Sequence, residues 1–183
     1  MDRVPGSPRK RTPSLGAIVH GAAPLLPTFL ALGLLACSPS RVMDGAYVNP
    51  TAGIRVPAPP APWVPVELPD VEAAFRRPGT AAIIAILSEC QDTGRAPMRI
   101  LARRLLFGLR SEVVEQAPIS VDGAEALRTV ARGTLDGRPV VVESLSVRRG
   151  HCVSDLVLAA PPGEFDSVRP DFDRMMAGLR ALP

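Results

Sequence analysis

Few residues of this 183-residue chain are of types that do chemistry, and they centre on Cys37, Cys90, Cys152 and His151. A structural zinc site needs four ligands, and beyond Cys37 the chain offers two cysteines and one histidine. A redox pair usually has CxxC spacing, which this pair lacks. His151 could activate Cys152, but neighbours on a strand point to opposite faces. We therefore expect no catalytic residue and no metal site, with a thiol or hydrolytic enzyme using Cys152 and His151 as the alternative.

The N-terminal segment has the pattern of a secretory leader, in which basic residues precede an apolar run and a small residue. No charged residue occurs from Thr12 to Ser40, and Leu25–Leu35 is strongly apolar. The motif Leu34-Leu35-Ala36-Cys37 resembles the lipobox of bacterial lipoproteins. This resemblance implies that residues 1–36 are a signal peptide and that the Cys37 thiol carries lipid. The alternatives are a transmembrane anchor, which needs about 20 apolar residues and is interrupted here by prolines and a glycine, and an ordinary secretory leader.

The residues after Cys37 bear on where the mature protein resides. In bacterial lipoproteins an aspartate at the next position commonly retains the product in the inner membrane, and here that residue is Ser38. The resemblance therefore implies the outer membrane, facing the periplasm, with the lipid as the membrane anchor. Residues 37–62 are rich in proline and small residues, which predicts a lipidated N-terminus and an extended tether. A single domain would occupy 63–183, with a first strand that could begin as early as residue 45.

Cys90 and Cys152 are an even pair once Cys37 is acylated. In an oxidising compartment such a pair predicts a disulfide. This bond would close a loop of about 60 residues, which chain-entropy estimates value at roughly 4 kcal/mol.

Charge and motifs exclude several classes of function. After Cys37 the chain has 17 arginines, no lysine and 17 carboxylates, so the mature domain is formally neutral and has no electrostatic footprint for nucleic acid. No dinucleotide-binding, P-loop or zinc-protease motif occurs, and we expect no cofactor. The group Arg99, Arg103 and Arg104 could contact an anion or a partner, although such a set is more often a solvated helix face.

Four runs of β type, separated by turn dipeptides, form the strongest fold signal. The dipeptides Asp122-Gly123 and Asp136-Gly137 suit two-residue hairpin loops, and Arg149-Gly150 separates the last two runs. Short connections force antiparallel neighbours, which predicts a four-stranded meander. The runs are Glu112–Val121, Ala124–Leu135, Pro139–Arg148 and Cys152–Ala160.

Apolar residues at three- and four-residue intervals predict two helices, Pro97–Leu109 and a second from about Pro170 to the C-terminus. Upstream, Ile54–Val56, Val71–Phe75 and Ala81–Leu87 are candidate strands. The predicted fold class is α+β, an antiparallel sheet containing the meander with two helices packed on it. Trp63, the only tryptophan, is expected to seal an edge of the core.

The order of these elements resembles the PsbP-like fold, named for an extrinsic photosystem protein and shared by many bacterial lipoproteins of unknown role. The resemblance rests on Gly53-Ile54-Arg55-Val56-Pro57 leading to Trp63 and on the strand, helix, meander and helix that follow. It spans roughly residues 45–182 and carries no transferable active site.

The features together predict a non-catalytic, membrane-anchored lipoprotein that binds a partner protein or assists assembly in the cell envelope. The alternative is a carrier or sensor of an unidentified small ligand bound between the sheet and the helices. An apolar pocket larger than about 300 Å³, the lower end of the usual range, would favour the alternative.

Overall fold

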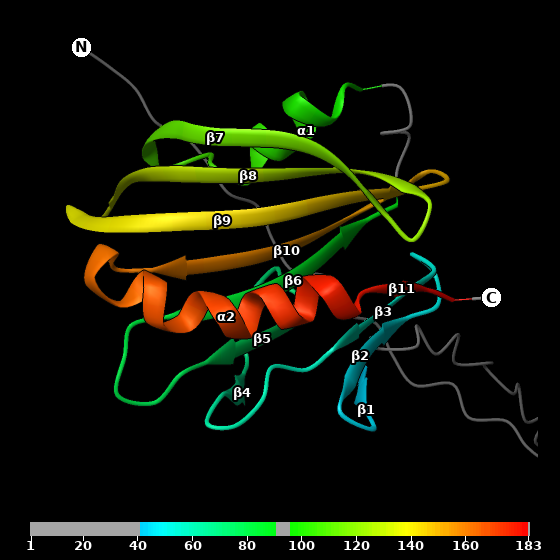
Figure 1. Cartoon of the computed structure of the whole chain (residues 1–183), viewed down its shortest axis with the longest axis horizontal. Coiled ribbons are helices and arrows are strands. Elements are labelled where there is room, and N and C mark those ends of the chain that lie inside the picture. Colours follow the sequence, from blue (N-terminus) through cyan, green and yellow to red (C-terminus); the bar gives the residue numbers. More distant parts are fainter. Residues whose placement is uncertain (1–40, 91–95, 183) are drawn as a thin grey trace, which may run out of the picture. The chain divides into compact units, whose positions relative to one another are not determined.

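A seven-stranded antiparallel sheet forms the body of the domain (Figure 1). The computed structural model describes residues 41–90 and 96–182. In spatial order the strands are β4 (Val64–Val66), β5 (Ala73–Arg76), β6 (Ile83–Glu89), β10 (Cys152–Ala160), β9 (Arg138–Arg149), β8 (Ala124–Leu135) and β7 (Arg110–Val121).

The predicted meander is confirmed, since β7, β8, β9 and β10 pair with their sequence neighbours. Positive φ angles at Asp122 and Asp136, 50° and 51°, are continued by glycines in both hairpin loops, as a type I′ turn requires. The third turn differs by one residue from the prediction. Its loop is Gly150-His151, because β9 continues through Arg149.

A second, four-stranded sheet that the sequence did not predict joins the two ends of the domain. Its order is β1 (Arg41–Met43), β2 (Ala46–Asn49), β3 (Ile54–Pro57) and β11 (Arg180–Ala181). The C-terminal strand β11 pairs with β3.

These strands correct the predicted tether at 37–62, because residues 41–57 are folded. The proline-rich stretch after them is tied to the domain by a hydrogen bond from the Ala58 amide to the Gly45 carbonyl, 2.8 Å long. It ends in a cis peptide bond between Ala61 and Pro62.

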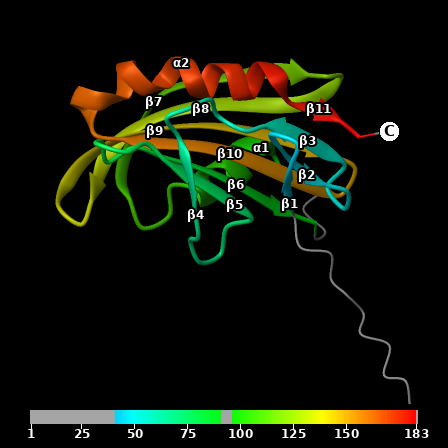
Figure 2. The ribbon, with the colours of Figure 1, turned by 90° about the horizontal axis from the view of Figure 1, so that it is seen from below.

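Helix α2 (Pro162–Gly178) covers one face of the seven-stranded sheet (Figure 2). It begins eight residues before the predicted start at Pro170, since Pro162 stands at the first helical position, where proline costs nothing. Pro170 lies inside the helix. The helix also ends before the C-terminus, where the chain turns into β11. Phe165, Val168, Phe172 and Met175 are its buried apolar residues.

Helix α1 (Met98–Arg104) lies on the other face of the sheet. Its buried residues Met98 and Leu101 pack on Leu127 and Val153. The residues that precede these two in their strands, Ala126 and Cys152, belong instead to the α2 core. The helix is shorter than predicted, because the chain after Arg104 leaves it through turns that end at Gly108, with φ at 86°.

The main core lies between α2, the sheet and strands β2 and β3. Trp63 seals this core as expected and donates a hydrogen bond of 2.7 Å from Nε1 to Asp171 of α2. The fully buried large side chains are Tyr47, Ile54, Ile84, Ile86, Leu145, Leu156, Leu158, Phe172, Met175 and Leu179.

The predicted signal peptide and the lipidation residue Cys37 lie outside the described residues. Within the described part of the chain, no helix combines the length and apolarity needed to cross a bilayer.

Candidate functional site

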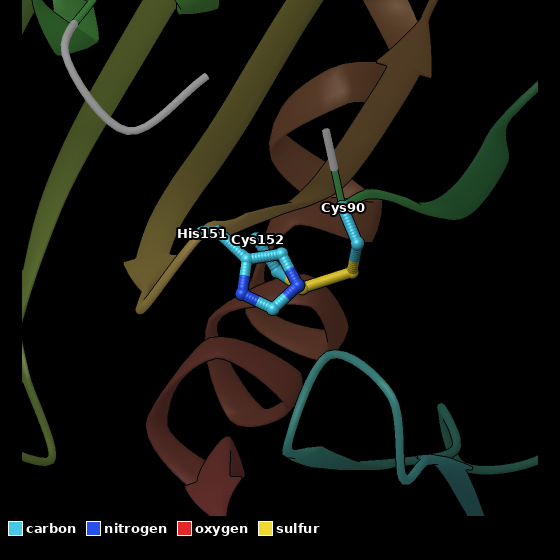
Figure 3. A group of neighbouring side chains, drawn as sticks. All are labelled: Cys90, His151 and Cys152. Carbon is cyan, nitrogen blue, oxygen red and sulfur yellow. A yellow bond between two sulfur atoms is a disulfide. The ribbon is translucent and has the colours of Figure 1, made fainter. Parts of the chain in front are cut away.

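The predicted partners Cys90 and Cys152 are joined by a disulfide (Figure 3). Cys152 begins β10, and Cys90 directly follows β6, whose Glu89 pairs with Val153. The bond therefore links two adjacent antiparallel strands, with 4.0 Å between the Cα atoms. Cys152 is buried. Disulfides of this kind are typical of proteins outside the cytoplasm.

His151 lies next to the disulfide, which corrects one step of the sequence reasoning. Its ring nitrogen and the two sulfur atoms lie within 4.8 Å of one another. His151 belongs to the turn before β10 rather than to the strand, so the alternation of strand side chains does not apply to it. In the disulfide, however, neither sulfur is the thiolate that nucleophilic attack or metal binding requires.

Ser154 and Asp155 leave opposite faces of the sheet. The Ser154 hydroxyl lies 3.0 Å from that of Ser88, on the α2 face. Asp155 is on the α1 face together with Val153, because strand side chains alternate. These residues and His151 therefore do not form a hydrolytic triad.

Asp155 is a partly buried carboxylate that the sequence reasoning missed. Its Oδ1 atom is buried and has no hydrogen-bond partner in the described part of the chain. Burial raises the pKa of Asp155 to about 6, an effect that Ser146 opposes and the charge of Glu89 reinforces. A signal for it was present, since Asp155 interrupts an otherwise apolar run in β10.

The carboxylate lines a cleft of about 260 Å³ between α1 and strands β6 and β10. Leu87, Leu101, Leu105 and Val153 supply apolar walls. The charged residues around it are Asp155, Asp70, Glu89 and Arg104, and Arg104 Nη1 lies 3.3 Å from Glu89 Oε2.

The predicted arginine group is carried by α1. Arg99, Arg103 and Arg104 are exposed, and only Arg104 has an ion-pair partner within the described ranges. Two apolar side chains share this exposed side, Ile100, 52% exposed, and Phe107, 94% exposed. We call these five residues the α1 surface. Beside it, a hollow of about 530 Å³ lies between Phe107 and the start of β7.

A buried ionic cluster lies on the α2 face and was also missed. The Glu143 side chain is completely buried and accepts a hydrogen bond from Arg128 Nε. Arg169 of α2 brings its Nε to 3.0 Å from the other carboxylate oxygen, and Glu115 lies 2.8 Å from Arg128 Nη1. Burial disfavours the charged form of Arg128, but the hydrogen bond to Glu143 and the negative charge of Glu143 favour it. The net effect is that the pKa of Arg128 is raised.

Two cavities lie between the sheet and α2, beside this cluster. They measure about 240 Å³ next to Arg169 and about 290 Å³ next to Arg128. A more apolar hollow of about 530 Å³ lies at the end of the sheet, around the loop between β8 and β9 and the end of β10.

Comparison with solved structures finds proteins with a similar fold. The cyanobacterial PsbP protein (CyanoP) of Synechocystis sp. PCC 6803 matches 74% of this chain and 91% of its own, with a TM-score of 0.53 and 14% identity. The domain has a PsbP-like fold. LpqN of Mycobacterium tuberculosis, described as involved in cell envelope biogenesis, matches 71% of this chain and 83% of its own, with a TM-score of 0.56 and 14% identity.

The sequence comparisons give no assignment, since no protein-family model and no curated protein matches the chain. At 14% identity the structural matches establish the fold alone.

Proposed function

We propose that this chain is a non-catalytic envelope lipoprotein, anchored through Cys37, whose PsbP-like domain binds a partner protein through the α1 surface. The observation that carries the proposal is the exposure of Phe107, whose aromatic ring is 94% accessible at the edge of a hollow of about 530 Å³. Phe107 shares the α1 surface with the exposed Ile100, and apolar patches rimmed by polar residues mark interaction sites. Aromatic and arginine side chains also dominate binding energy at interfaces.

The charge of the α1 surface defines the chemistry of the partner. Arg99, Arg103 and Arg104 surround Ile100 and Phe107, and the acidic Glu89 pairs with Arg104 alone. A partner surface with carboxylates around an apolar pocket for Phe107 is therefore the best match, because complementary charge steers association and fixes specificity.

The absence of catalysis is supported by the state of the most reactive residues. Cys90 and Cys152 share a disulfide, so a thiol enzyme would first have to reduce it. Titration of free thiols in protein purified from the envelope should find none, whereas two free thiols would contradict this part of the proposal.

The anchor and the membrane are tested by metabolic labelling with an alkyne analogue of palmitate and by density-gradient separation of membranes. The wild-type protein should carry label and sediment with the outer membrane, and Cys37→Ala should lose the label. Sedimentation with the inner membrane would overturn the proposed location, and a labelled Cys37→Ala variant would overturn the anchor.

The partner is tested with a photo-crosslinking amino acid at position 100 of the full-length protein in cells. We expect one discrete adduct, at least fivefold weaker when Phe107→Ala and Arg103→Glu are added. The matched control places the crosslinker at Leu68, a 37% exposed residue in the loop between β4 and β5. Equal adducts from positions 68 and 100, or an adduct unchanged by the two substitutions, would overturn the proposal.

A small-ligand carrier is the second candidate, and one observation favours it. The hollow of about 530 Å³ at the end of the sheet is lined mainly by apolar residues such as Ile83, Leu135 and Val140 and exceeds the lower end of ligand-site volumes. The cavities between sheet and α2, where a ligand was expected, are smaller. Mass spectrometry of the native protein should detect a co-purifying ligand if this role is correct.

A further inference from the structure

The cleft between α1 and strands β6 and β10 has a charged base and apolar walls. Asp155 lies at its base, with one carboxylate oxygen buried and without a hydrogen-bond partner in the described residues. An ionised carboxylate in such a place is unfavourable unless it is paired. Burial and the negative charge of Glu89 raise the pKa of Asp155 to about 6, although its interaction with the Ser146 hydroxyl lowers it. The group is therefore ionised at neutral pH and has a neutral hydroxyl beside it but no counter-charge among the described residues.

No cation of the domain's own fills this role among the described residues. Arg104, the one basic residue that lines the cleft, is paired with Glu89 at 3.3 Å. With Asp155, Glu89 and Asp70 against Arg104, the lining carries a formal charge of −2 at neutral pH. The chain from Ser38 onward contains no lysine, so no ammonium group of its own can reach the carboxylate.

The side chains that line the cleft determine which kind of cation it can bind. Calcium and magnesium need six or more oxygen ligands, supplied by several carboxylates, carbonyls or waters. Glu89 is already paired with Arg104, so Asp70 and Asp155 are the carboxylates of the lining left for an ion. Much of the remaining lining is aliphatic, from Leu87, Leu101 and Leu105, and gives no such ligands. An aliphatic stem can pack against these leucines, while a charged end pairs with the carboxylate.

We propose that this cleft binds an aliphatic primary ammonium group, with its charged end against the Asp155 carboxylate and its stem against Leu87, Leu101 and Leu105. The group can come from a free alkylamine or from a lysine side chain of another protein. The inference does not rest on the partner proposed for the α1 surface, because it needs neither Phe107 nor Arg103.

The experiment titrates the ¹⁵N-labelled full-length protein in detergent with butylammonium and with the slightly longer uncharged alcohol 1-pentanol. We expect saturable shifts of the amide signals of Leu87, Val153 and Asp155 with butylammonium and at least tenfold weaker binding of pentanol. Asp155→Asn should weaken butylammonium binding at least tenfold. The control Asp173→Asn, an exposed aspartate of α2, should leave it unchanged.

A second variant keeps the test decisive if Asp155→Asn perturbs the fold. Leu105→Lys places an ammonium group in the cleft from the chain itself, and it should abolish butylammonium binding while the rest of the spectrum stays native. Equal binding of pentanol and butylammonium, or wild-type binding by Asp155→Asn or Leu105→Lys, would overturn the proposal. So would the lack of saturable shifts in the wild type.

A third probe, lysine blocked at both its amino and carboxyl ends, distinguishes the two sources. Binding as tight as that of butylammonium assigns the cleft to protein lysines, whereas exclusion of the blocked lysine assigns it to free amines. Phe107→Ala, which tests the proposed partner, should leave all these titrations unchanged. The two proposals can therefore fail separately.

Discussion

Glu143 and Asp155 are strand carboxylates on opposite faces of one sheet, and each lies beside a helix, Glu143 completely buried and Asp155 partly so. On the α2 face, Glu143 lies between the guanidinium groups of Arg128 and Arg169. Each carboxylate has one buried oxygen without a hydrogen bond among the described residues, but Glu143 Oε2 lies 3.0 Å from Arg169 Nε, whereas Asp155 on the α1 face has no ion-pair partner in that part of the domain. The α2 face thus satisfies its buried charge internally, whereas the α1 face leaves a charge available to something outside the domain.

The two helices also differ in how well their apolar side chains are buried. Helix α2 spans 17 residues and buries Phe165, Phe172 and Met175. Helix α1 spans seven residues and leaves Phe107, just beyond its end, almost fully exposed. A fold gains little by exposing an aromatic ring, so the difference supports the proposal that the α1 face binds a partner while the α2 face stabilises the domain.

The largest expected effect compares one phenylalanine from each face. Phe172→Ala should lower the free energy of unfolding by about 4 kcal/mol, because it opens a cavity where the side chain is completely buried. Phe107→Ala should change it by less than about 0.5 kcal/mol, as is usual for exposed residues. Urea unfolding of the detergent-solubilised protein measures both. A loss above about 2 kcal/mol for Phe107→Ala would contradict the division between the faces.

The ionic cluster of the α2 face should be the next most sensitive feature. Glu143→Gln leaves Arg128 and Arg169 without their shared carboxylate, and we expect a loss of about 3 kcal/mol. The matched control is Glu115→Gln, which removes the 55% exposed partner of Arg128 and should cost less than about 1 kcal/mol. Equal losses in urea unfolding would show that burial of Glu143 does not set the difference.

The meander and the two helices were predictable in outline and the second sheet was not, for a physical reason. Periodic apolar residues and the turns at Asp122-Gly123 and Asp136-Gly137 are local signals, and they identified the meander. The pairing of β11 with β3 joins residues about 125 positions apart and has too few residues for a pattern.

Sequence spacing also does not reveal the environment of individual side chains. No local pattern marks Asp171 as a core residue, yet it is buried and accepts a hydrogen bond from Trp63. The disulfide was predictable from cysteine count and compartment. The isolation of Asp155 depends on which side chains surround the cleft, and three-dimensional packing alone determines that.

The next prediction concerns Asp155 and depends on pH. Its substitution should raise stability at neutral pH, whereas the first two substitutions lower it. Its pKa is raised from 3.8 to about 6, so the folded state holds the proton more tightly than the unfolded chain. This group therefore favours folding most below pH 4, and that contribution is lost as pH rises through about 6. At about 1.4 kcal/mol per pKa unit, the loss is at most about 3 kcal/mol.

Asp155→Asn should remove this dependence and raise stability at pH 7 by about 2 kcal/mol. The measurement is the difference in unfolding free energy between pH 5 and pH 7, which should be smaller in the variant. Asp173→Asn, on the opposite face, is the control and should keep the wild-type difference. A variant less stable than wild type at pH 7 would indicate that Asp155 already has a stabilising partner.

The smallest effect concerns Arg104, and it sharpens the argument for an unpaired Asp155. Arg104 and Glu89 have side chains 57% and 48% exposed, and exposed pairs contribute little. We expect Arg104→Gln to change stability by less than about 0.5 kcal/mol, with no difference from wild type in 1 M salt, where such pairs are screened. Arg99→Gln, also on α1, is the control. A loss above about 1.5 kcal/mol that persists in 1 M salt would mean that Arg104 reaches Asp155 in solution, and the cleft would then already contain its cation.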